Sequence, residues 1–201
     1  MTHQNLVLKE MLKELIGYID GDYFLSDGGL LGLHREGKLI DYDNDLDLYL
    51  LPGTTINIPD NSNLGILNYY MDRKVFRKDV EKHKTNKWLE YLSYLRVLPQ
   101  CQNMNRAQLL SHAKPLYYAE SKASEYSLPY IDIFELEFKN DCYEIPFWTR
   151  KNGFKYFKTE VELLQTNNDL GFPVSVPNNI EHILLRQYGD NWKTPDSNFK
   201  Y

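Results

Sequence analysis

A short run of aspartates carries the strongest chemical signal in this sequence. Asp41, Asp43, Asp45 and Asp47 fall within the segment DYDNDLDLYLL. The last part alternates polar and apolar residues, so Asp45 and Asp47 are predicted to lie on one face of a strand and the leucines on the other. Two carboxylates side by side on a buried strand need a partner that neutralises them. A divalent cation would do so, and carboxylate oxygens favour Mg²⁺ or Mn²⁺.

A pair of glycines precedes the acids. Gly28 and Gly29 follow an apolar strand expected at 23–25 and lead, through a turn, into a short helix expected at 30–35. Such a turn can present backbone N–H groups to a phosphate at the helix N-terminus. Arg35 carries a fork-shaped guanidinium that suits phosphate oxygens or the carboxylates themselves. We therefore expect the two glycines and Arg35 to bind an anionic ligand.

A third carboxylate lies on a distant strand. Residues 130–138 alternate cleanly, and Asp132 is the one acid on a largely apolar face of that strand. Joined to Asp45 and Asp47, it would complete the ligands of a cation or act as general base on an acceptor hydroxyl. Asp45, Asp47 and Asp132 are therefore our candidates for both the catalytic and the metal-binding residues.

The same acids also have a plain structural explanation, in which DYDNDLD is an acidic turn that leads into a strand. Judged on the acids alone, the two explanations are equally good. The order of features along the chain favours a catalytic site, because a glycine turn, a short helix and an alternating acidic strand follow one another directly. Asp41 and Asp43 are then the approach to the site rather than its ligands.

Hydrophobic periodicity predicts the elements that must position these residues. Helices are expected at 5–20, 65–98 and 180–188, and strands at 23–25, 39–51, 130–138, 142–145 and 172–176. This pattern predicts one α/β (α+β) domain with a small mixed sheet, helices packed on it, and a helical insertion from about residue 64 to 115. The insertion contains a basic segment, residues 73–87, which we interpret as a solvated helix face in preference to a surface for an anionic substrate.

Length, charge and cysteine content exclude several classes of protein. The chain has 201 residues, enough for one domain, and its net charge of −5 is unlike that of a nucleic-acid-binding protein. Its two cysteines have neither metal-ligand nor disulfide-framework spacing, which favours a reducing compartment. The N-terminus lacks the pattern of a signal peptide, and no apolar run approaches the roughly 20 residues needed to cross a bilayer. We therefore expect a soluble, cytoplasmic protein.

Three motifs, in this order, resemble those of the LicD/fukutin family of phosphotransferases. The first, GGLLGLHREGKLIDYDNDLDL, contains the glycine pair and the strand aspartates; the second is YIDIFELEF and the third FPVSVPNNIEHILLRQYGDNW. The chain departs from the family's pattern at Asp41 and Tyr42 in place of Pro-Trp, at Asn44 in place of Asp, and at Glu135 in place of Pro. Residues 64–127 show no match. These departures leave the three candidate aspartates in place.

The resemblance implies a nucleotidyltransferase-like fold, with residues 1–201 as a single domain. It also implies an enzyme that uses Mg²⁺ (or Mn²⁺) and transfers the phospho-group of a CDP-activated alcohol, such as choline, ribitol or glycerol phosphate, to a glycan or sugar hydroxyl. Such a displacement needs charge neutralisation, in-line positioning and a base near the nucleophile, which fits the predicted site. Nucleotidyl transfer to a small molecule, protein or RNA would need much the same site, and a catalytically silent binding module with the same fold is a further alternative.

Overall fold

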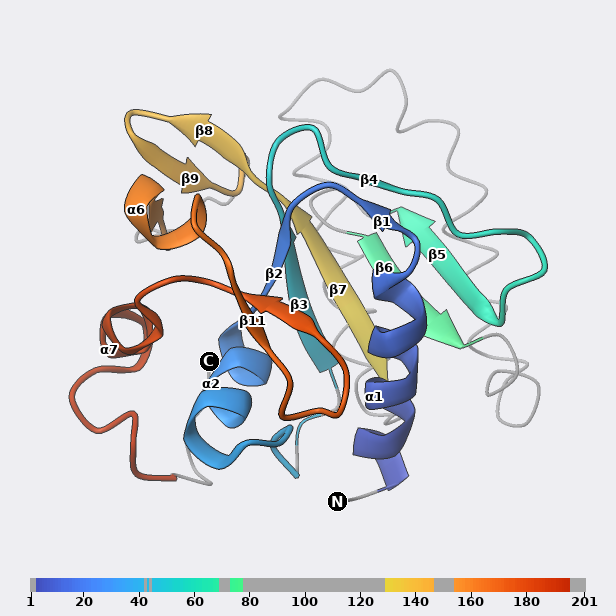
Figure 1. The fold of residues 1–201 in the computed structure, drawn as a ribbon, viewed down its shortest axis with the longest axis horizontal. Helices are drawn as coiled ribbons and strands as arrows, with labels where there is room; N and C mark the ends of the chain where they lie inside the picture. Colours follow the sequence, from blue (N-terminus) through green and yellow to red (C-terminus); the bar gives the residue numbers. More distant parts are fainter. Residues whose placement is uncertain are drawn as a thin grey trace, which may run out of the picture.

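The protein is built around one mixed β-sheet (Figure 1). The computed structural model describes residues 3–41, 43, 45–68, 73–77, 129–146 and 154–195. The five strands of the sheet lie in the order β2 (Tyr23–Ser26), β3 (Asp45–Leu50), β7 (Tyr130–Glu135), β6 (Arg73–Arg77) and β5 (Leu64–Asn68). Within this sheet β3 and β7 run parallel, and the other neighbouring pairs are antiparallel. This mixed architecture confirms the predicted fold class.

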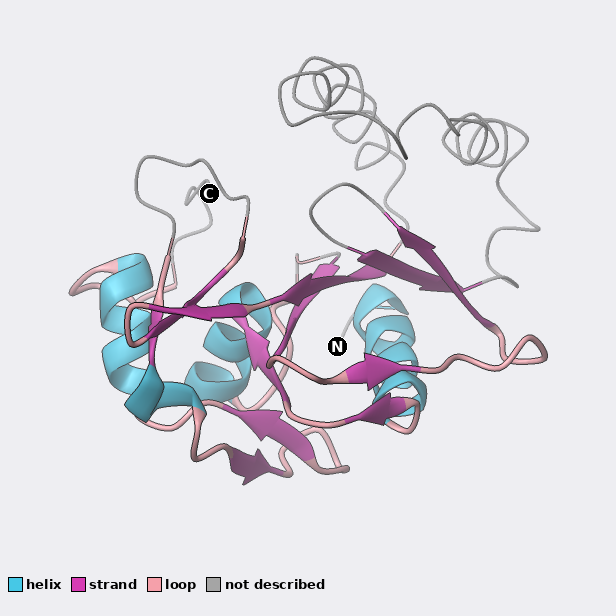
Figure 2. Ribbon diagram, turned by 90° about the horizontal axis from the view of Figure 1, so that it is seen from above, coloured by secondary structure: helices cyan, strands magenta, loops and turns pink. Residues whose placement is uncertain are grey.

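Two helices lie on one face of the sheet, as Figures 1 and 2 show. In helix α1 (His3–Ile16), apolar residues recur at steps of three and four and line one side of the helix. The fully buried members of this side are Leu8, Met11, Leu12 and Leu15. Helix α2 (Asp27–Glu36) packs on the leucines of β2 and β3. The alternation in β3 completes this core, because Leu46 and Leu48 are buried while the aspartates point to the other face.

Smaller elements complete the domain around the sheet. Strand β1 (Ile19–Asp20) pairs with β4 (Thr55–Ile56). Strand β9 (Cys142–Glu144) pairs on one side with β8 (Glu137–Lys139) and on the other with β10 (Tyr156–Phe157). Strand β11 (Gln165–Asn167) pairs with β12 (Val174–Val176). Two further helices are α6 (Lys158–Val161) and α7 (Ile180–Tyr188). Strand β12 lies against β2, and α7 packs on α2. The last part of the chain therefore returns to the elements that precede the acidic strand.

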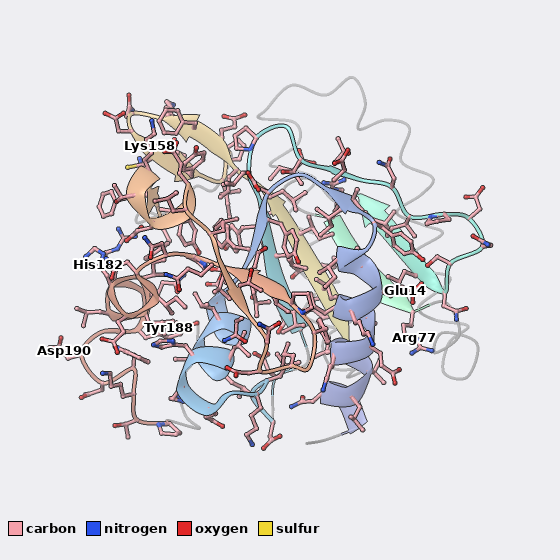
Figure 3. All side chains as sticks on the ribbon, in the orientation of Figure 1. Glu14, Arg77, Lys158, His182, Tyr188 and Asp190 are labelled. Carbon is pink, nitrogen blue, oxygen red and sulfur yellow. The ribbon has the colours of Figure 1, made fainter. Side chains whose placement is uncertain are left out.

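A buried glutamate ties the last helix to the domain. Glu160 of α6 is 2% exposed, and its Oε2 accepts a hydrogen bond from the backbone N–H of Phe157 at 2.7 Å. Its Oε1 lies 2.9 Å from Nδ1 of His182, which Figure 3 shows on the outer side of α7. The guanidinium of Arg186 lies 3.6 Å from Glu160 Oε2 and adds a positively charged partner. These contacts fix α7 beside α6.

Several predicted elements are confirmed. The last helix begins at Ile180 and ends at Tyr188, as expected. The strand predicted at 23–25 is β2, and the one predicted at 172–176 contains β12. The alternating segment 130–138 forms β7 and then β8, with a break at Leu136, and β9 returns after the predicted hairpin turn.

The helix expected at 65–98 is wrong where the structure describes that segment. Residues 64–68 and 73–77 form the antiparallel strands β5 and β6, and β6 also pairs with β7. A short apolar segment can fit a helical or an alternating pattern, and pairing decides here, because Val75 of β6 fills the core beside Ile131 of β7. The rest of this helix, and most of the insertion expected at about 64–115, lie outside the described residues.

The glycine pair lies within a helix rather than in a turn before it. Helix α2 begins at Asp27, so Gly28 and Gly29 belong to its first turn, and both are buried. A Cβ added at Gly29 would lie 3.0 Å from side-chain atoms of Leu25 and Leu46. Glycine therefore allows α2 to approach β2 and β3 closely, which is a packing reason for its presence.

The acidic strand begins later than expected. Its predicted range is 39–51, whereas β3 begins at Asp45. The side-chain amide of Asn5 donates hydrogen bonds of 3.2 Å to the backbone carbonyls of Leu39 and Ile40. Helix α1 thus uses acceptors that a strand would offer to its neighbour. This contact fixes the position at which the chain enters the acidic run.

Gly32 provides a test of how closely α2 packs on the segment that leads to the acids. An added Cβ would lie 2.7 Å from the carbonyl oxygen of Lys38 and 3.0 Å from the backbone nitrogen of Ile40. Because backbone atoms cannot turn aside, Gly32→Ala should lower the free energy of unfolding by about 1–3 kcal/mol. Helix propensity alone would change it in the opposite direction, by about 1 kcal/mol. Urea denaturation measures the difference.

Gly29→Ala is the matched control on the same helix. The nearest atoms to its added Cβ belong to the side chains of Leu25 and Leu46 and not to the backbone, and side chains can adjust, so the loss of stability should be smaller than for Gly32→Ala. A Gly32→Ala protein as stable as the wild type would contradict the close packing of α2 on residues 38–40.

Candidate functional site

Strand register brings polar side chains into one row across the sheet. Ser26 of β2 pairs with Asp47 of β3, and Asp47 pairs with Asp132 of β7. Lys74 of β6 pairs with Asp132 from the other side. Asp45 lies two residues before Asp47 and therefore on the same face of β3. The structure thus brings together the three aspartates predicted as catalytic and metal-binding, and we call them the acid cluster.

Two other side chains contact the acid cluster directly. The Nζ of Lys74 lies 2.5 Å from Oδ1 of Asp132, and both side chains are about nine-tenths buried. The hydroxyl of Tyr130 donates a hydrogen bond of 3.0 Å to Oδ2 of Asp45. The Lys74 ammonium also lies 4.4 Å from the centroid of the Tyr130 ring, within the range of a cation–π interaction. A cation and a phenol thus engage two of the three carboxylates.

Asp47 lies at the centre of the negative charge. Burial raises the pKa of its carboxyl well above the usual range, and four neighbouring carboxylates raise that pKa further. These neighbours are Asp27, Asp45, Asp132 and Asp43. Burial, followed by the charge of Asp45, likewise raises the pKa of Tyr130, which keeps its hydroxyl protonated as a donor. Such a concentration of carboxylates favours the uptake of a cation or a proton.

A fourth carboxylate reaches the site from the first residue of α2. Asp27 has a φ of 47°, unusual for a residue other than glycine, and its Oδ1 accepts a hydrogen bond of 3.3 Å from Gln187 on α7. Gln187 also donates to the hydroxyl of Tyr156 at 3.3 Å, and that hydroxyl shares a hydrogen bond with Oγ of Ser26. The hydroxyl of Tyr49 on β3 bonds to Asp27 as well. This network connects α2, α7, β2, β3 and β10 beside the acid cluster.

Aromatic rings pack along the same face of the sheet, next to the acids. Phe24, Tyr49 and Phe134 occupy one register row on β2, β3 and β7. The centroid of the Tyr49 ring lies 5.6 Å from that of Phe24 and 5.1 Å from that of Phe134. Tyr156 packs edge-on against Tyr49, with centroids 5.4 Å apart. These contacts hold the three strands in fixed positions, and hence the carboxylates they carry.

The two glycines predicted to bind an anion lie close to this row. Gly28 and Gly29 stand in the first turn of α2, which begins directly after Ser26, the register partner of Asp47. The backbone N–H groups of a first helical turn have no partner within the helix, and the helix dipole places partial positive charge there. The position suits an anionic ligand, although close packing is by itself sufficient to explain Gly29.

Arg35 lies at the other end of α2. It stands eight residues after Asp27, which corresponds to about 12 Å along a helix. Its Nε donates to Oε1 of Glu36 at 3.0 Å, and its Nη1 lies 3.5 Å from the backbone carbonyl of Trp192. In the described part of the chain, the contacts of Arg35 therefore lie at the C-terminal end of α2, away from the acid cluster.

A family model described as LicD/FKTN/FKRP, nucleotidyltransferase domain, matches residues 21–179. The chain belongs to this family. The matched region includes all three carboxylates of the acid cluster and Lys74. None of the curated proteins compared with the chain matches it.

Membership of the LicD/FKTN/FKRP family confirms the resemblance drawn from the three motifs. It indicates a phosphotransferase- or nucleotidyltransferase-like role in glycan modification. The family also includes inactive members, so the activity of one chain must be argued from its own site. Among the helices that the structure describes, none is long and apolar enough to cross a membrane.

The acid cluster offers the type of ligand that a divalent cation prefers. Its donors are carboxylate oxygens, which suit Mg²⁺ or Mn²⁺. Burial, and then the charges of neighbouring carboxylates, raise the pKa of Asp47, so a further positive charge is favourable there. Within the described ranges, no three His, Cys, Asp or Glu side chains are arranged to hold a metal ion as they stand. In the structure Lys74 also holds Oδ1 of Asp132, an oxygen that a cation would use. The acid cluster of this LicD/FKTN/FKRP domain thus has the ligand chemistry for a divalent cation. To bind the cation, Asp132 would have to give up its contact with Lys74.

Sequence analysis missed three residues of the site, for different reasons. Tyr130 had a usable signal, because it lies two residues before Asp132 on the same strand face. Asp27 stands beside the glycine pair, but an acid in a first helical turn is common and suggests nothing further. Lys74 had no such signal, because residues 73–87 were expected to form a solvated helix face, and only the pairing of β6 with β7 places it at the acid cluster.

Asp47→Asn should stabilise the protein at pH 7 in metal-free buffer. The folded state holds this carboxyl at a raised pKa, so its charged form costs stability. That cost is absent below the ordinary carboxyl pKa of about 4 and grows as the pH rises towards the raised pKa of the folded state. Urea denaturation should show a gain of about 1 kcal/mol or more at pH 7 that shrinks towards zero near pH 4.

Asp41→Asn is the control for this measurement. A hydrogen bond from Lys38 lowers the pKa of Asp41, so the loss of its charge should give no gain in stability at pH 7. If Asp47→Asn is less stable than the wild type at pH 7 in metal-free buffer, the charge of Asp47 is balanced in the folded protein and the electrostatic description above is wrong.

Proposed function

We propose that this protein is a metal-dependent phosphotransferase. It moves a phospho-alcohol group, such as phosphocholine or a polyol phosphate, from a CDP-activated donor to a hydroxyl of a glycan or sugar. The observation that carries the proposal is the register of the parallel strands β3 and β7, which sets Asp47 beside Asp132 with Asp45 on the same face. Family membership supports the general class of reaction.

The acid cluster would hold Mg²⁺ or Mn²⁺ through Asp45, Asp47 and Asp132. When bound, the cation would neutralise the charge of the donor's phosphates. The carboxylates lie on adjacent strands whose spacing is set by backbone hydrogen bonds, so a cation that they held would offer the donor's phosphates a fixed position. The backbone N–H groups of Gly28 and Gly29 would bind a donor phosphate oxygen at the start of α2. Arg35 stays a prediction, and it would need to leave its contacts at the far end of α2 to reach a phosphate.

The transfer itself requires a base for the acceptor hydroxyl. A carboxylate oxygen of Asp132 would take the hydroxyl proton as the acceptor oxygen attacks the phosphorus that carries the alcohol. The bond from that phosphorus to the bridging oxygen breaks, so the products are a phosphodiester on the sugar and CMP. Asp132 would serve either in this role or as a ligand of the cation, and its side-by-side position with Asp47 is compatible with both.

One contact favours a second candidate, a catalytically silent binding module with the same fold. The ammonium of Lys74 already neutralises Asp132 at 2.5 Å, as a side chain can do in a site that has lost its cation. Nucleotidyl transfer would need the same acid cluster, and the preferred nucleotide distinguishes it from phospho-alcohol transfer.

Titration calorimetry with CDP-choline, CDP-ribitol, CTP and ATP, each with Mg²⁺, tests the proposal. We expect Mg²⁺-dependent binding with a preference for an intact CDP-alcohol over the free nucleotides, because the alcohol phosphate is the group to be transferred. A preference for CTP or ATP would replace phospho-alcohol transfer with nucleotidyl transfer. No Mg²⁺-dependent binding of any of the four would support the silent module.

Conservative substitutions then test the residues. With the CDP-alcohol that binds, Asp45→Asn, Asp47→Asn and Asp132→Asn should each lower the rate of CMP release to a glycan acceptor by roughly 100-fold or more. Asp169→Asn, in the turn between β11 and β12, is the matched control and should retain the wild-type rate. Full activity in the Asp45 or Asp47 variant would overturn the metal assignment, and full activity in Asp132→Asn would remove this residue as both ligand and base.

A further inference from the structure

Among the residues that the structure describes, Lys74 is the cation whose side chain contacts the acid cluster. Its Nζ lies 2.5 Å from Oδ1 of Asp132, in a pair whose side chains are only 11% and 10% exposed. The ammonium also lies over the Tyr130 ring, and the hydroxyl of that ring donates to Asp45. Lys74 therefore contacts one carboxylate of the cluster directly and another through Tyr130.

The position of Lys74 is fixed by the fold rather than by a chance meeting of surface side chains. It is the register partner of Asp132 on the antiparallel strands β6 and β7, so the two side chains lie on the same face at close range. Its neighbours along β6, Arg73 and Arg77, point to the other face, where they pair with Glu135 and Glu10. The basic strand thus divides its charges between the two faces.

An ion pair at this place has a consequence for cation binding. A carboxylate oxygen held by an ammonium at 2.5 Å is not available to a divalent cation, and the two positive charges repel each other at such short range. Removal of the ammonium without a replacement would in turn leave Asp132 in a buried cluster of like charges. Either positive group can neutralise Asp132, and both cannot occupy the same oxygen.

We propose that Lys74 is the resident counter-ion of the acid cluster, which holds Asp132 in the metal-free protein and competes with the divalent cation for it. This inference rests on the proposed metal site and adds the residue that controls its occupancy. Lys74 is accordingly a positioning residue: it keeps Asp132 in place until a cation takes over.

Calorimetric titration with Mn²⁺ alone, on the full chain, tests this competition. It compares the wild type with Lys74→Met, which keeps an unbranched side chain one heavy atom shorter and removes the charge. Lys74→Met should bind Mn²⁺ roughly tenfold more tightly or better, because the competing charge is gone. Without metal its thermal midpoint should fall, and Mn²⁺ should raise that midpoint more than in the wild type. A lysine with only a structural role would leave the Mn²⁺ affinity unchanged.

Arg77→Met is the matched control for the loss of one positive charge. Arg77 lies on the same strand but on the opposite face, beside α1 in Figure 3, and pairs with Glu10 at 3.0 Å. Its substitution should leave the Mn²⁺ affinity close to that of the wild type. An equal gain in Arg77→Met and Lys74→Met would mean that overall charge, rather than competition at Asp132, controls binding, and the inference would fall.

Lys74→Arg keeps the test decisive if Lys74→Met does not fold. The guanidinium retains the charge and can hold Asp132 through two hydrogen bonds, so Mn²⁺ affinity should equal that of the wild type or lie below it. Tighter Mn²⁺ binding by Lys74→Arg would overturn the competition. If wild type and Lys74→Met bind Mn²⁺ equally, the role of Lys74 is refuted while the metal site stands; if neither binds Mn²⁺, both are refuted.

Discussion

The concentration of negative charge between β3 and β7 is the constraint on which the rest of this structure depends. Parallel pairing sets Asp47 beside Asp132, and the alternation of β3 adds Asp45 to the same face. Like charges at this spacing oppose the strand pairing that creates them. Residues around the two strands offset that repulsion.

Three kinds of interaction offset the repulsion. Lys74 brings a full positive charge to Asp132, Tyr130 donates a hydrogen bond to Asp45, and the N-terminus of α2 adds a partial positive charge next to the row. On the other face, the leucines of β3 are buried against the helices, and burial of apolar area favours the same strand register that crowds the carboxylates. Burial of the apolar face therefore determines the register of β3, and the crowding of carboxylates on the polar face follows from that register.

The acidic strand, the alternating segment around Asp132 and the last helix were predictable from sequence because their periodicity is local. The proximity of Asp132 to Asp45 and Asp47 could be predicted as a hypothesis, because a single acid on an otherwise apolar strand face indicates a polar partner. Lys74 was not, because the segment that contains it fits a helix as well as a strand, and its place is decided by pairing with β7. Asp27 and Gln187 were not predicted for a related reason. Neither residue type is unusual at its place in its own helix, and the two meet only where α7 packs on α2.

The contacts that build the site join parts of the chain that are far apart in sequence. Tyr130 and Asp45 are separated by 85 residues, Ser26 and Tyr156 by 130, and Asp27 and Gln187 by 160. Closure of such long loops is slow and costs entropy before any contact repays it. During synthesis from the N-terminus, the acidic strand emerges well before β7, and β7 emerges before α7. The acid cluster and its network therefore cannot be complete until β7 and α7 have been made, and a chain that lacks them carries Asp45 and Asp47 without the neighbours that hold them.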